Sequence, residues 1–383
     1  MKRVINIVFI FIFAVLISFP YLFAHRDRQG RVSSMENRML ARYPVLWDAE
    51  EGLNTDYLSQ FELWLNDNLR GRTVMTEINS TLQYKLFGRI VKTDILRGKN
   101  NWLFVRDDEM IREFQHQNLM SEAELDAYAL NMQKIADYMK NKEIAFYYFQ
   151  CYSKETIYPE QYASGINQIG TVYMADQIVS ALETKTSVEQ VLVKEILAEH
   201  KDELVYYQYV DSLHWNERGS YFGYQVFMDT IRKDFPMVPV LGEEDYLITE
   251  AESAVDLYGY LYPYAELCPI YTIKEPKATE ITQTETDIER WDFLRFKEHT
   301  HEYINEDSGN DLKILILGDS FFRMFLKDDV AESFASTLSI DWLNISILEE
   351  VIEEYQPDIV VIESAESALP DTIGLINQVD LSE

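Results

Sequence analysis

Short apolar runs alternate with amphipathic stretches over most of this chain. Residues 53–87 carry apolar side chains at helical spacing. Residues 121–141 repeat that spacing behind Ser121, with Glu124 three positions later, as in a capping box. The apolar run 144–149 that follows is short enough to be a buried strand. This alternation predicts an α/β fold in which helices cover a mainly parallel sheet.

The same pattern continues toward the C-terminus. Residues 188–200 predict an amphipathic helix, residues 204–207 a strand, and residues 219–231 another helix. The apolar runs 313–317 and 359–362 are typical of buried parallel strands. We therefore expect these two runs to lie near one another in one sheet and to end at the same edge.

Residues 240–310 break the pattern, since they are acidic, rich in tyrosine and without helical period. Within them Tyr258, Tyr260, Tyr262 and Tyr264 alternate with other residues. One interpretation is an aromatic platform for sugars, and the other is a surface β insertion that packs its tyrosines on the core. The second is favoured, because aromatic stripes serve packing more often than recognition.

The first 24 residues are nearly all apolar after Lys2 and Arg3. About 20 apolar residues suffice to cross a bilayer. Leu22, two positions before Ala24, makes a poor signal-peptidase site, so we expect an uncleaved signal anchor. The predicted organisation is an anchor over residues 1–24, a polar linker over 25–52 and one α/β domain over 53–383, with an insertion at about 240–310.

Composition narrows the range of partners. The chain has 383 residues, 47% of them apolar, which is enough to bury a large core. Its formal charge of −31, from 65 acidic and 34 basic residues, argues against nonspecific binding to nucleic acid or to anionic membrane surfaces. A neutral or zwitterionic glycan is easier to accommodate. Cys151 and Cys268 have no metal-binding spacing, and the sequence leaves open whether they pair.

The strongest chemical signal is Gly318-Asp319-Ser320, directly after the apolar run 313–317. A strand that stops at a glycine delivers the next side chains to the carboxyl edge of the sheet, which makes Ser320 a candidate nucleophile. A serine needs a base and a group that orients the base. Asp211 precedes His214 by three residues, so its carboxylate can meet Nδ1–H while Nε2 faces a hydroxyl. Asp211, His214 and Ser320 form a candidate triad.

Weaker candidates surround these residues. His299 and His301 share one face of a potential strand and are a candidate zinc site, although an exposed polar loop explains them equally well. Asp319 is expected to hold the serine turn by accepting backbone N–H bonds. Trp215 and Asn216 are candidates for shaping an acyl pocket, and Trp215 alternatively seals the core.

The Gly-Asp-Ser and Asp-x-x-His blocks resemble those of the SGNH hydrolase superfamily, although here the histidine block comes first. That order resembles the circularly permuted SGNH-like domain of the alginate O-acetyltransferase family, the AlgJ/AlgX-like or DHHW-type proteins. Residues 95–104, which contain Gly-Lys-Asn-Asn-Trp-Leu-Phe, and residues 154–160, which contain Lys and Tyr-Pro-Glu, resemble further blocks of that family. The resemblance covers about residues 33–370.

The resemblance implies an extracytoplasmic polysaccharide O-acetyltransferase, held at the cell membrane by the N-terminal anchor and working with a polytopic membrane O-acyltransferase. Ser320 would be the nucleophile and one backbone oxyanion donor, His214 the base, and Asp211 the orienting acid. The chemistry needs no cofactor and no metal. A carbohydrate acetylesterase with the same triad and a non-catalytic glycan-binding or assembly subunit are the alternatives.

Two departures from the family pattern bear on the site. The relatives place the histidine two residues after the aspartate, whereas Asp211 and His214 are three apart. The superfamily's oxyanion-hole asparagine block is occupied here by Glu363-Ser364-Ala365-Glu366. The sequence therefore identifies no second side-chain oxyanion donor.

Overall fold

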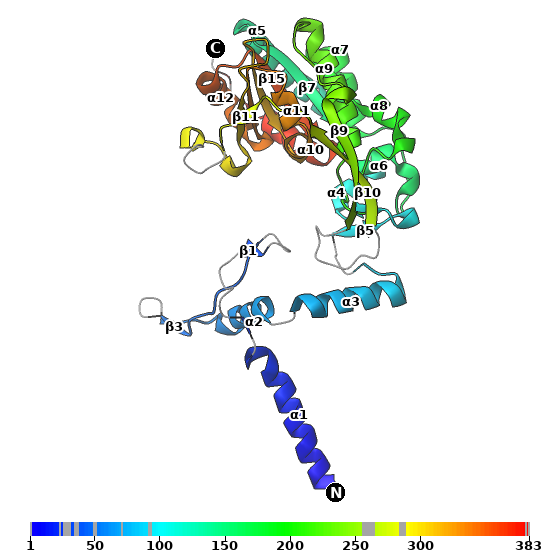
Figure 1. The fold of residues 1–383 in the computed structure, drawn as a ribbon, viewed down its shortest axis with the longest axis vertical. Helices are drawn as coiled ribbons and strands as arrows, with labels where there is room; N and C mark the ends of the chain where they lie inside the picture. The colour runs from blue at the N-terminus through cyan, green and yellow to red at the C-terminus, as the bar shows by residue number, and fades with distance from the viewer. Residues whose placement is uncertain are drawn as a thin grey trace. The chain divides into compact units, whose positions relative to one another are not determined.

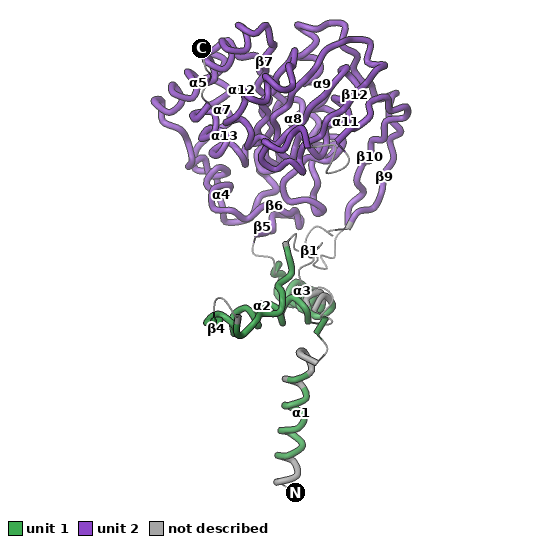
Figure 2. The backbone as a smooth tube through the Cα atoms, turned by 90° about the vertical axis from the view of Figure 1, so that its left-hand side faces the viewer, with its two compact units in different colours: residues 1–92, 254–264 green, residues 93–253, 265–383 purple. Residues whose placement is uncertain are grey.

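The computed structural model describes residues 2–22, 24–25, 32–33, 38–48, 52–69, 72–90, 94–254, 265–282, 289–379 and 381. The chain forms two compact units, one of residues 1–92 with 254–264 and one of residues 93–253 with 265–383 (Figure 2). The predicted α/β domain over residues 53–383 stays a prediction from the sequence. The amphipathic period of residues 53–87 does identify helices, but it does not tell which core they pack against.

The described residues of the first unit form three helices and two short strand pairs (Figure 1). They are α1 (Lys2–Leu22), α2 (Tyr57–Asn68) and α3 (Arg72–Phe87), with β1 (Val32–Ser33) paired to β2 (Arg38–Met39) and β3 (Trp47–Asp48) paired to β4 (Gly52–Leu53). Trp64 of α2 is buried against Tyr43 and Phe61. Within the described residues, no helix combines the length and the apolar character needed to cross a membrane. The predicted anchor stays a prediction from the sequence.

A seven-stranded sheet forms the centre of the second unit, in the order β11-β12-β14-β13-β15-β7-β8. Its five strands from β14 to β8 are parallel, and β11 and β12 extend one edge antiparallel. The strands are β7 (Ala145–Cys151), β8 (Glu189–Leu192), β11 (Thr279–Glu280), β12 (His301–Ile304), β13 (Lys313–Gly318), β14 (Ser336–Asp341) and β15 (Ile359–Ala365). The prediction of a mainly parallel sheet is confirmed.

The chain reverses its direction across the sheet at β13. From β13 it passes through α10 (Ser320–Phe325) and α11 (Lys327–Ala331) to β14, and from there through α12 (Leu348–Tyr355) to β15 on the other side of β13. The predicted neighbours are in register, since Ile314 pairs with Ile359 and Leu317 with Ile362. Ligands of open α/β sheets bind at such a switch point, outside the carboxyl ends of the strands.

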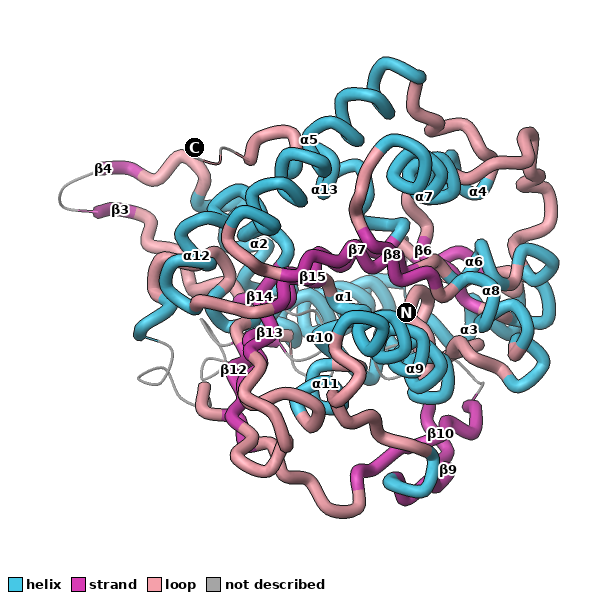
Figure 3. Tube along the Cα trace, turned by 90° about the horizontal axis from the view of Figure 1, so that it is seen from above, coloured by secondary structure: helices cyan, strands magenta, loops and turns pink. Residues whose placement is uncertain are grey.

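Helices cover both faces of the sheet (Figure 3). Those on one face are α5 (Glu122–Asn141), α7 (Met174–Lys185) and α13 (Leu369–Ile376), and α9 (Glu217–Asp234), α10 and α11 lie on the other. The capping box of α5 is present as predicted: Glu124 N donates to Ser121 Oγ, and Ser121 N donates to the Glu124 carboxylate at 2.8 Å. The remaining elements are β5 (Ile95–Arg97), β6 (Leu103–Val105), α4 (Asp108–Phe114), α6 (Lys154–Ile157), α8 (Lys194–Glu199), β9 (Tyr246–Ala254) and β10 (Ala265–Ile273).

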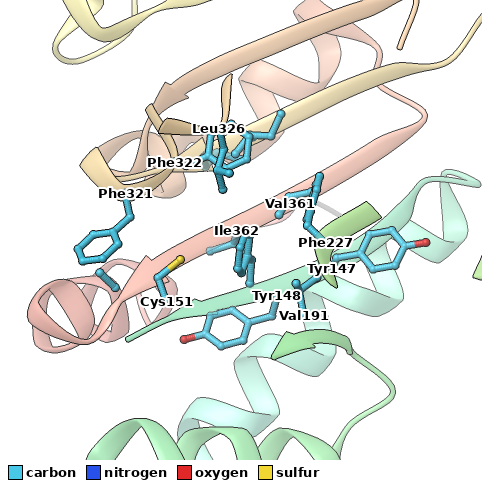
Figure 4. Close-up of a cluster of buried hydrophobic side chains, with 14 of the residues drawn as sticks. Tyr147, Tyr148, Cys151, Val191, Phe227, Phe321, Phe322, Leu326, Val361 and Ile362 are labelled. Atoms are coloured by element: carbon cyan, nitrogen blue, oxygen red, sulfur yellow. The ribbon is translucent and has the colours of Figure 1, made fainter. Parts of the chain in front are cut away.

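The core lies between the sheet and its helices. Central strands such as β13 and β15 are buried on both faces, which is why their sequences are continuously apolar. Figure 4 shows part of this core, which includes Tyr148, Val361 and Ile362 from the strands and Phe227 and Phe322 from the helices. Fully burying one such side chain stabilises the fold by roughly 1.5–3 kcal/mol.

Three sequence predictions need correction or comment. Residues 188–200 are not one helix, because β8 occupies their first half and α8 their second. Residues 204–207 form no regular strand, although Tyr206 makes an isolated bridge with Trp215. Within residues 240–310, β9 and β10 pair with each other and β11 and β12 join the edge of the main sheet, while the tyrosines at 258–264 lie outside the described residues.

Candidate active site

Ser320 lies where β13 ends and α10 begins, at the switch point of the sheet. The preceding Asp319 is the N-cap of α10, and its carboxylate accepts the backbone N–H groups of Phe321 and Ala365, each at 2.8 Å. The predicted role of Asp319 in holding the serine turn is confirmed. Because Ala365 ends β15, these bonds fix the turn to the neighbouring strand.

Glu363 supports the same turn from β15. Its fully buried carboxyl accepts the Asp319 N–H at 2.8 Å. Burial, followed by the charge of Asp319, raises the pKa of Glu363 well above its ordinary value, which favours its neutral form. Gly318 leaves the room for this contact, since a Cβ there would lie 3.0 Å from Glu363 Oε2 and 3.1 Å from Phe322 Cβ.

Asp211 and His214 come from the loop between η3 (Lys201–Glu203) and α9. Asp211 Oδ1 accepts the backbone N–H groups of Leu213 at 2.7 Å and His214 at 2.9 Å, which makes a tight turn. Asp211 Oδ2 lies 2.9 Å from His214 Nδ1. The interval of three residues therefore lets one carboxylate hold both the loop and the imidazole.

Asp211 remains a carboxylate in this environment. Burial raises its pKa, but the hydrogen bonds and charge of His214, together with the charge of Lys154, outweigh burial and place the pKa well below its ordinary value. A carboxylate at Oδ2 makes Nδ1 the protonated nitrogen of a neutral His214, so Nε2 is an acceptor.

The structure brings Ser320 and His214 together across 106 positions of sequence. Ser320 Oγ–H donates to His214 Nε2 at 2.8 Å. The side chains of His214 and Asp211 are only 12% and 11% exposed, and the imidazole lies against Phe321, with ring centres 4.8 Å apart. This geometry is the one that lets a serine lose its proton to a histidine as it attacks a carbonyl.

The residues next to His214 have structural roles. Trp215 is fully buried against Phe321, and a Cβ at Gly223 would lie 2.9 Å from its ring. Asn216 is the N-cap of α9, accepting the N–H groups of Arg218 and Gly219. For Trp215, this packing agrees with the alternative that it seals the core.

Glu366, in the block that replaces the superfamily asparagine, also faces the protein interior. Its Oε2 accepts Ser153 N–H at 2.7 Å and Thr156 Oγ1–H at 2.6 Å, which ties the end of β15 to the segment after β7. Burial raises the pKa of Glu366 to about 8. Sequence reasoning missed the inward orientation of Glu363 and Glu366. The available signal was their position directly at the end of a buried strand.

The other candidates are dispersed. His299 Nδ1 lies 2.8 Å from Asp341 Oδ2, whereas His301 Nδ1 lies 2.6 Å from Glu280 Oε1. The described residues include no group of three or more histidine, cysteine, aspartate or glutamate side chains arranged to hold a metal ion. Cys151 and Cys268, whose pairing the sequence left open, are both buried and free.

A cavity of about 290 Å³ lies beside the loop that carries Asp211 and His214. Its lining includes Tyr207, Tyr209, Arg218 and Glu266. The ring of Tyr207 is 6.3 Å from that of Phe325, which in turn is 5.7 Å from the imidazole of His214. The cavity is thus close to the loop that carries His214.

A family model and several solved structures are similar to this chain. The model of the family described as "SGNH hydrolase-like domain, acetyltransferase AlgX" matches residues 95–324, more than half of the chain and all three residues of the candidate triad. A comparison with curated proteins finds no match.

Similar solved structures include PatB1 of Bacillus cereus, with 17% identity, a TM-score of 0.54 and coverage of 72% of this chain and 96% of that one. The same protein was also solved with a sulfonyl adduct. A DHHW family protein of Eubacterium siraeum has 15% identity, a TM-score of 0.50 and coverage of 76% and 99%. The O-acetyltransferase domain of Pseudomonas putida AlgJ has 12% identity, a TM-score of 0.48 and coverage of 76% and 100%. At these identities, the likenesses to PatB1 and to the DHHW family protein show the fold alone.

Proposed function

The chain belongs to the family of SGNH hydrolase-like domains of the AlgX acetyltransferase type, and from this premise we propose that it O-acetylates an extracytoplasmic polysaccharide through Ser320, His214 and Asp211. The observation that carries the proposal is the continuous hydrogen-bonded line from Asp211 Oδ2 through both nitrogens of His214 to Ser320 Oγ, with distances of 2.9 and 2.8 Å.

The chemistry has two halves. In the first, Ser320 Oγ attacks the acetyl carbonyl of the donor while its proton passes to His214 Nε2. The tetrahedral intermediate collapses, the bond to the leaving group breaks, and that group takes the proton from Nε2. The result is an acetyl ester on Ser320 and a neutral His214.

In the second half, His214 Nε2 takes the proton of an acceptor hydroxyl as the hydroxyl oxygen attacks the acetyl carbon. Collapse breaks the bond from the acetyl carbon to Ser320 Oγ, and Nε2 returns the proton to Ser320. Asp211 holds the imidazole in both halves and stabilises its positive charge. The backbone N–H of Ser320, at the first position of α10, would donate to the oxyanion.

The acceptor and the acetyl source follow from the family and from charge. The proposal assigns the acceptor to a polysaccharide outside the cytoplasm, and the donor to a polytopic membrane O-acyltransferase. A net charge of −31 favours a neutral or zwitterionic polymer over a polyanion. The proposal includes the predicted anchor at residues 1–24, which would keep the domain beside such a membrane partner.

A sulfonyl fluoride tests the catalytic part, since it reacts with an activated serine. We expect stoichiometric labelling of Ser320, and no labelling after Ser320→Ala or His214→Ala. Ser180→Ala, on the exposed side of α7, is the matched control and should label like the wild type. Absence of labelling in a folded wild-type protein would favour the non-catalytic assembly subunit.

Product analysis tests the acceptor. We expect the wild-type protein, given an activated acetyl ester and neutral oligosaccharides, to yield acetylated sugar faster than free acetate. Release of acetate alone, with the same dependence on Ser320, would instead identify an acetylesterase.

A further inference from the structure

A carboxylate outside the triad holds the loop that carries Asp211 and His214. Glu266 of β10 accepts three consecutive backbone N–H groups, from Gln208 at 2.7 Å, Tyr209 at 3.3 Å and Val210 at 3.0 Å. Asp211 follows these residues directly. Three successive amides around one anion form a concave site of the kind that binds a charge strongly, since each bond is charge-assisted.

Lys154 holds the same loop through backbone carbonyl oxygens, whereas Glu266 holds it through backbone N–H groups. Its Nζ is buried and donates to the backbone carbonyl oxygens of Asp211 and Leu103, the latter at 2.9 Å. Burial lowers the pKa of Lys154 to about 8, and the charges of Asp211 and Glu266 counteract that effect. Leu103 N also donates to the Gln208 carbonyl at 2.9 Å, so the loop is bound through both its N–H groups and its carbonyl oxygens.

The strand that supplies Glu266 is itself fixed to the helix after the loop. Tyr271 of β10 donates its backbone N–H to Glu217, the first residue of α9, and its ring lies 5.4 Å from that of Tyr221. The pair β9 and β10 is separate from the seven-stranded sheet. The loop is therefore held at residues 208–210 and at the start of α9 by the same strand.

We propose that Glu266 is a positioning residue for catalysis, which fixes the loop so that His214 reaches Ser320. The proposal rests on the serine chemistry proposed above. Residues 204–216 contain no helix or regular strand, apart from an isolated β bridge between Tyr206 and Trp215. Without an anion at the amides of residues 208–210, that backbone loses three bonds next to Asp211, and the 2.8 Å contact of His214 with Ser320 loosens.

Glu266→Gln is the informative change, because it keeps the size of the side chain and removes its charge. The NH2 group of the glutamine then faces a backbone N–H, and two donors cannot form a hydrogen bond with each other. Displacements of about 1 Å in a catalytic group cost on the order of 100-fold. We expect kcat for an acetyl ester and the rate of Ser320 sulfonylation to fall by about 10- to 100-fold, with KM changed by less than about 3-fold because Glu266 acts away from the substrate.

Glu250→Gln is the matched control, since Glu250 lies on the paired strand β9, lines the same cavity and is exposed. It should retain the wild-type rates. Glu266→Asp keeps the charge but is one methylene shorter, so we expect a rate between those of the wild type and Glu266→Gln. If Glu266→Gln fails to fold, Glu266→Asp takes its place as the test.

Sulfonylation separates the two proposals. Labelling of Ser320 in the wild type supports the triad, and slower labelling in Glu266→Gln, with a wild-type unfolding temperature, supports the positioning role. Equal labelling rates in the wild type and the Glu266 variant that folds would overturn the role of Glu266 and leave the triad standing. No labelling of the folded wild type would overturn both.

Discussion

Replacing Asp211 by asparagine should reveal what the carboxylate adds beyond holding the loop. Asp211 Oδ1 accepts two backbone N–H groups, and an asparagine oxygen can accept them equally. The asparagine nitrogen then faces His214 Nδ1, where the structure has a carboxylate oxygen at 2.9 Å. Because that nitrogen is a donor, Nδ1 must become the acceptor and Nε2 must carry the proton. Ser320 then has no base.

The size of the effect follows from the charges. A carboxylate and an imidazolium about 4 Å apart attract by roughly 4 kcal/mol at an effective dielectric constant of about 20. The side chains of Asp211 and His214 are 11% and 12% exposed, so solvent screens them little. A loss of about 4 kcal/mol from the transition state is about a 1000-fold lower rate, and the wrong tautomer lowers it further, toward about 10,000-fold.

The assay is the rate of acetyl-ester turnover, measured together with Ser320 sulfonylation and thermal unfolding. We expect Asp211→Asn to lower kcat by at least about 1000-fold while the fold is retained. Asp211→Ala, which also removes the acceptor of the Leu213 and His214 N–H groups, should additionally lower the unfolding temperature. Turnover of Asp211→Asn within about 10-fold of the wild type would show that His214 is oriented by another group, and the triad would have to be redrawn.

Three further predictions address stability and location. The folded-state pKa of Glu366, about 8, lies above its ordinary value, so between about pH 5 and 8 the folded protein holds a proton that the unfolded chain has lost. The free energy of unfolding should therefore fall as pH rises over this range, by up to about 1.4 kcal/mol per pH unit. In urea unfolding, Glu366→Gln should lack this contribution to the pH dependence, and Glu353→Gln, at an exposed position, should keep it. Gly318→Ala should cost about 1–3 kcal/mol in the same assay and slow Ser320 sulfonylation, because its Cβ would press on Glu363 and Phe322; unchanged values would show that the turn has spare room. Protease added to intact spheroplasts should digest residues 33–383, and their protection, or a soluble form that starts near His25, would contradict the predicted anchor.

The sequence predicted those parts of the fold whose signals are local. The capping box at Ser121 and the continuous apolar runs of β13 and β15 depend on neighbours in sequence, and all appear in the structure. Residues 188–200 were mistaken for one helix, because a run as short as β8 fits both the helical and the strand period. The bounds of the α/β domain stay a prediction, since helical period says nothing about tertiary partners.

The residues of the site also divide into those with a local sequence signal and those without one. Ser320 and the Asp211–His214 pair could be named from motifs because their residue types and intervals carry the chemistry. Glu266 could not, since its carboxylate acts on backbone N–H groups 56 to 58 positions away, and backbone groups leave no residue type to recognise. Lys154 was noted only as part of a family block. Lys154 lies on α6, so its bond to the Asp211 carbonyl depends on how the fold brings α6 and the loop together.

The departures from the family pattern are explained by what the carboxyl groups contact. At an interval of three, Asp211 closes the turn with one oxygen and meets His214 with the other, so the altered spacing preserves the orientation of the imidazole. At the end of β15, Glu363 occupies the place of the superfamily asparagine block, but its carboxyl binds the Asp319 N–H and not an oxyanion. Burial, followed by the charge of Asp319, raises the pKa of Glu363 well above its ordinary value, which favours the neutral carboxyl group. The bond from the Asp319 N–H to Glu363 therefore helps to place Ser320, and the oxyanion donor that we propose is the backbone N–H of Ser320 itself.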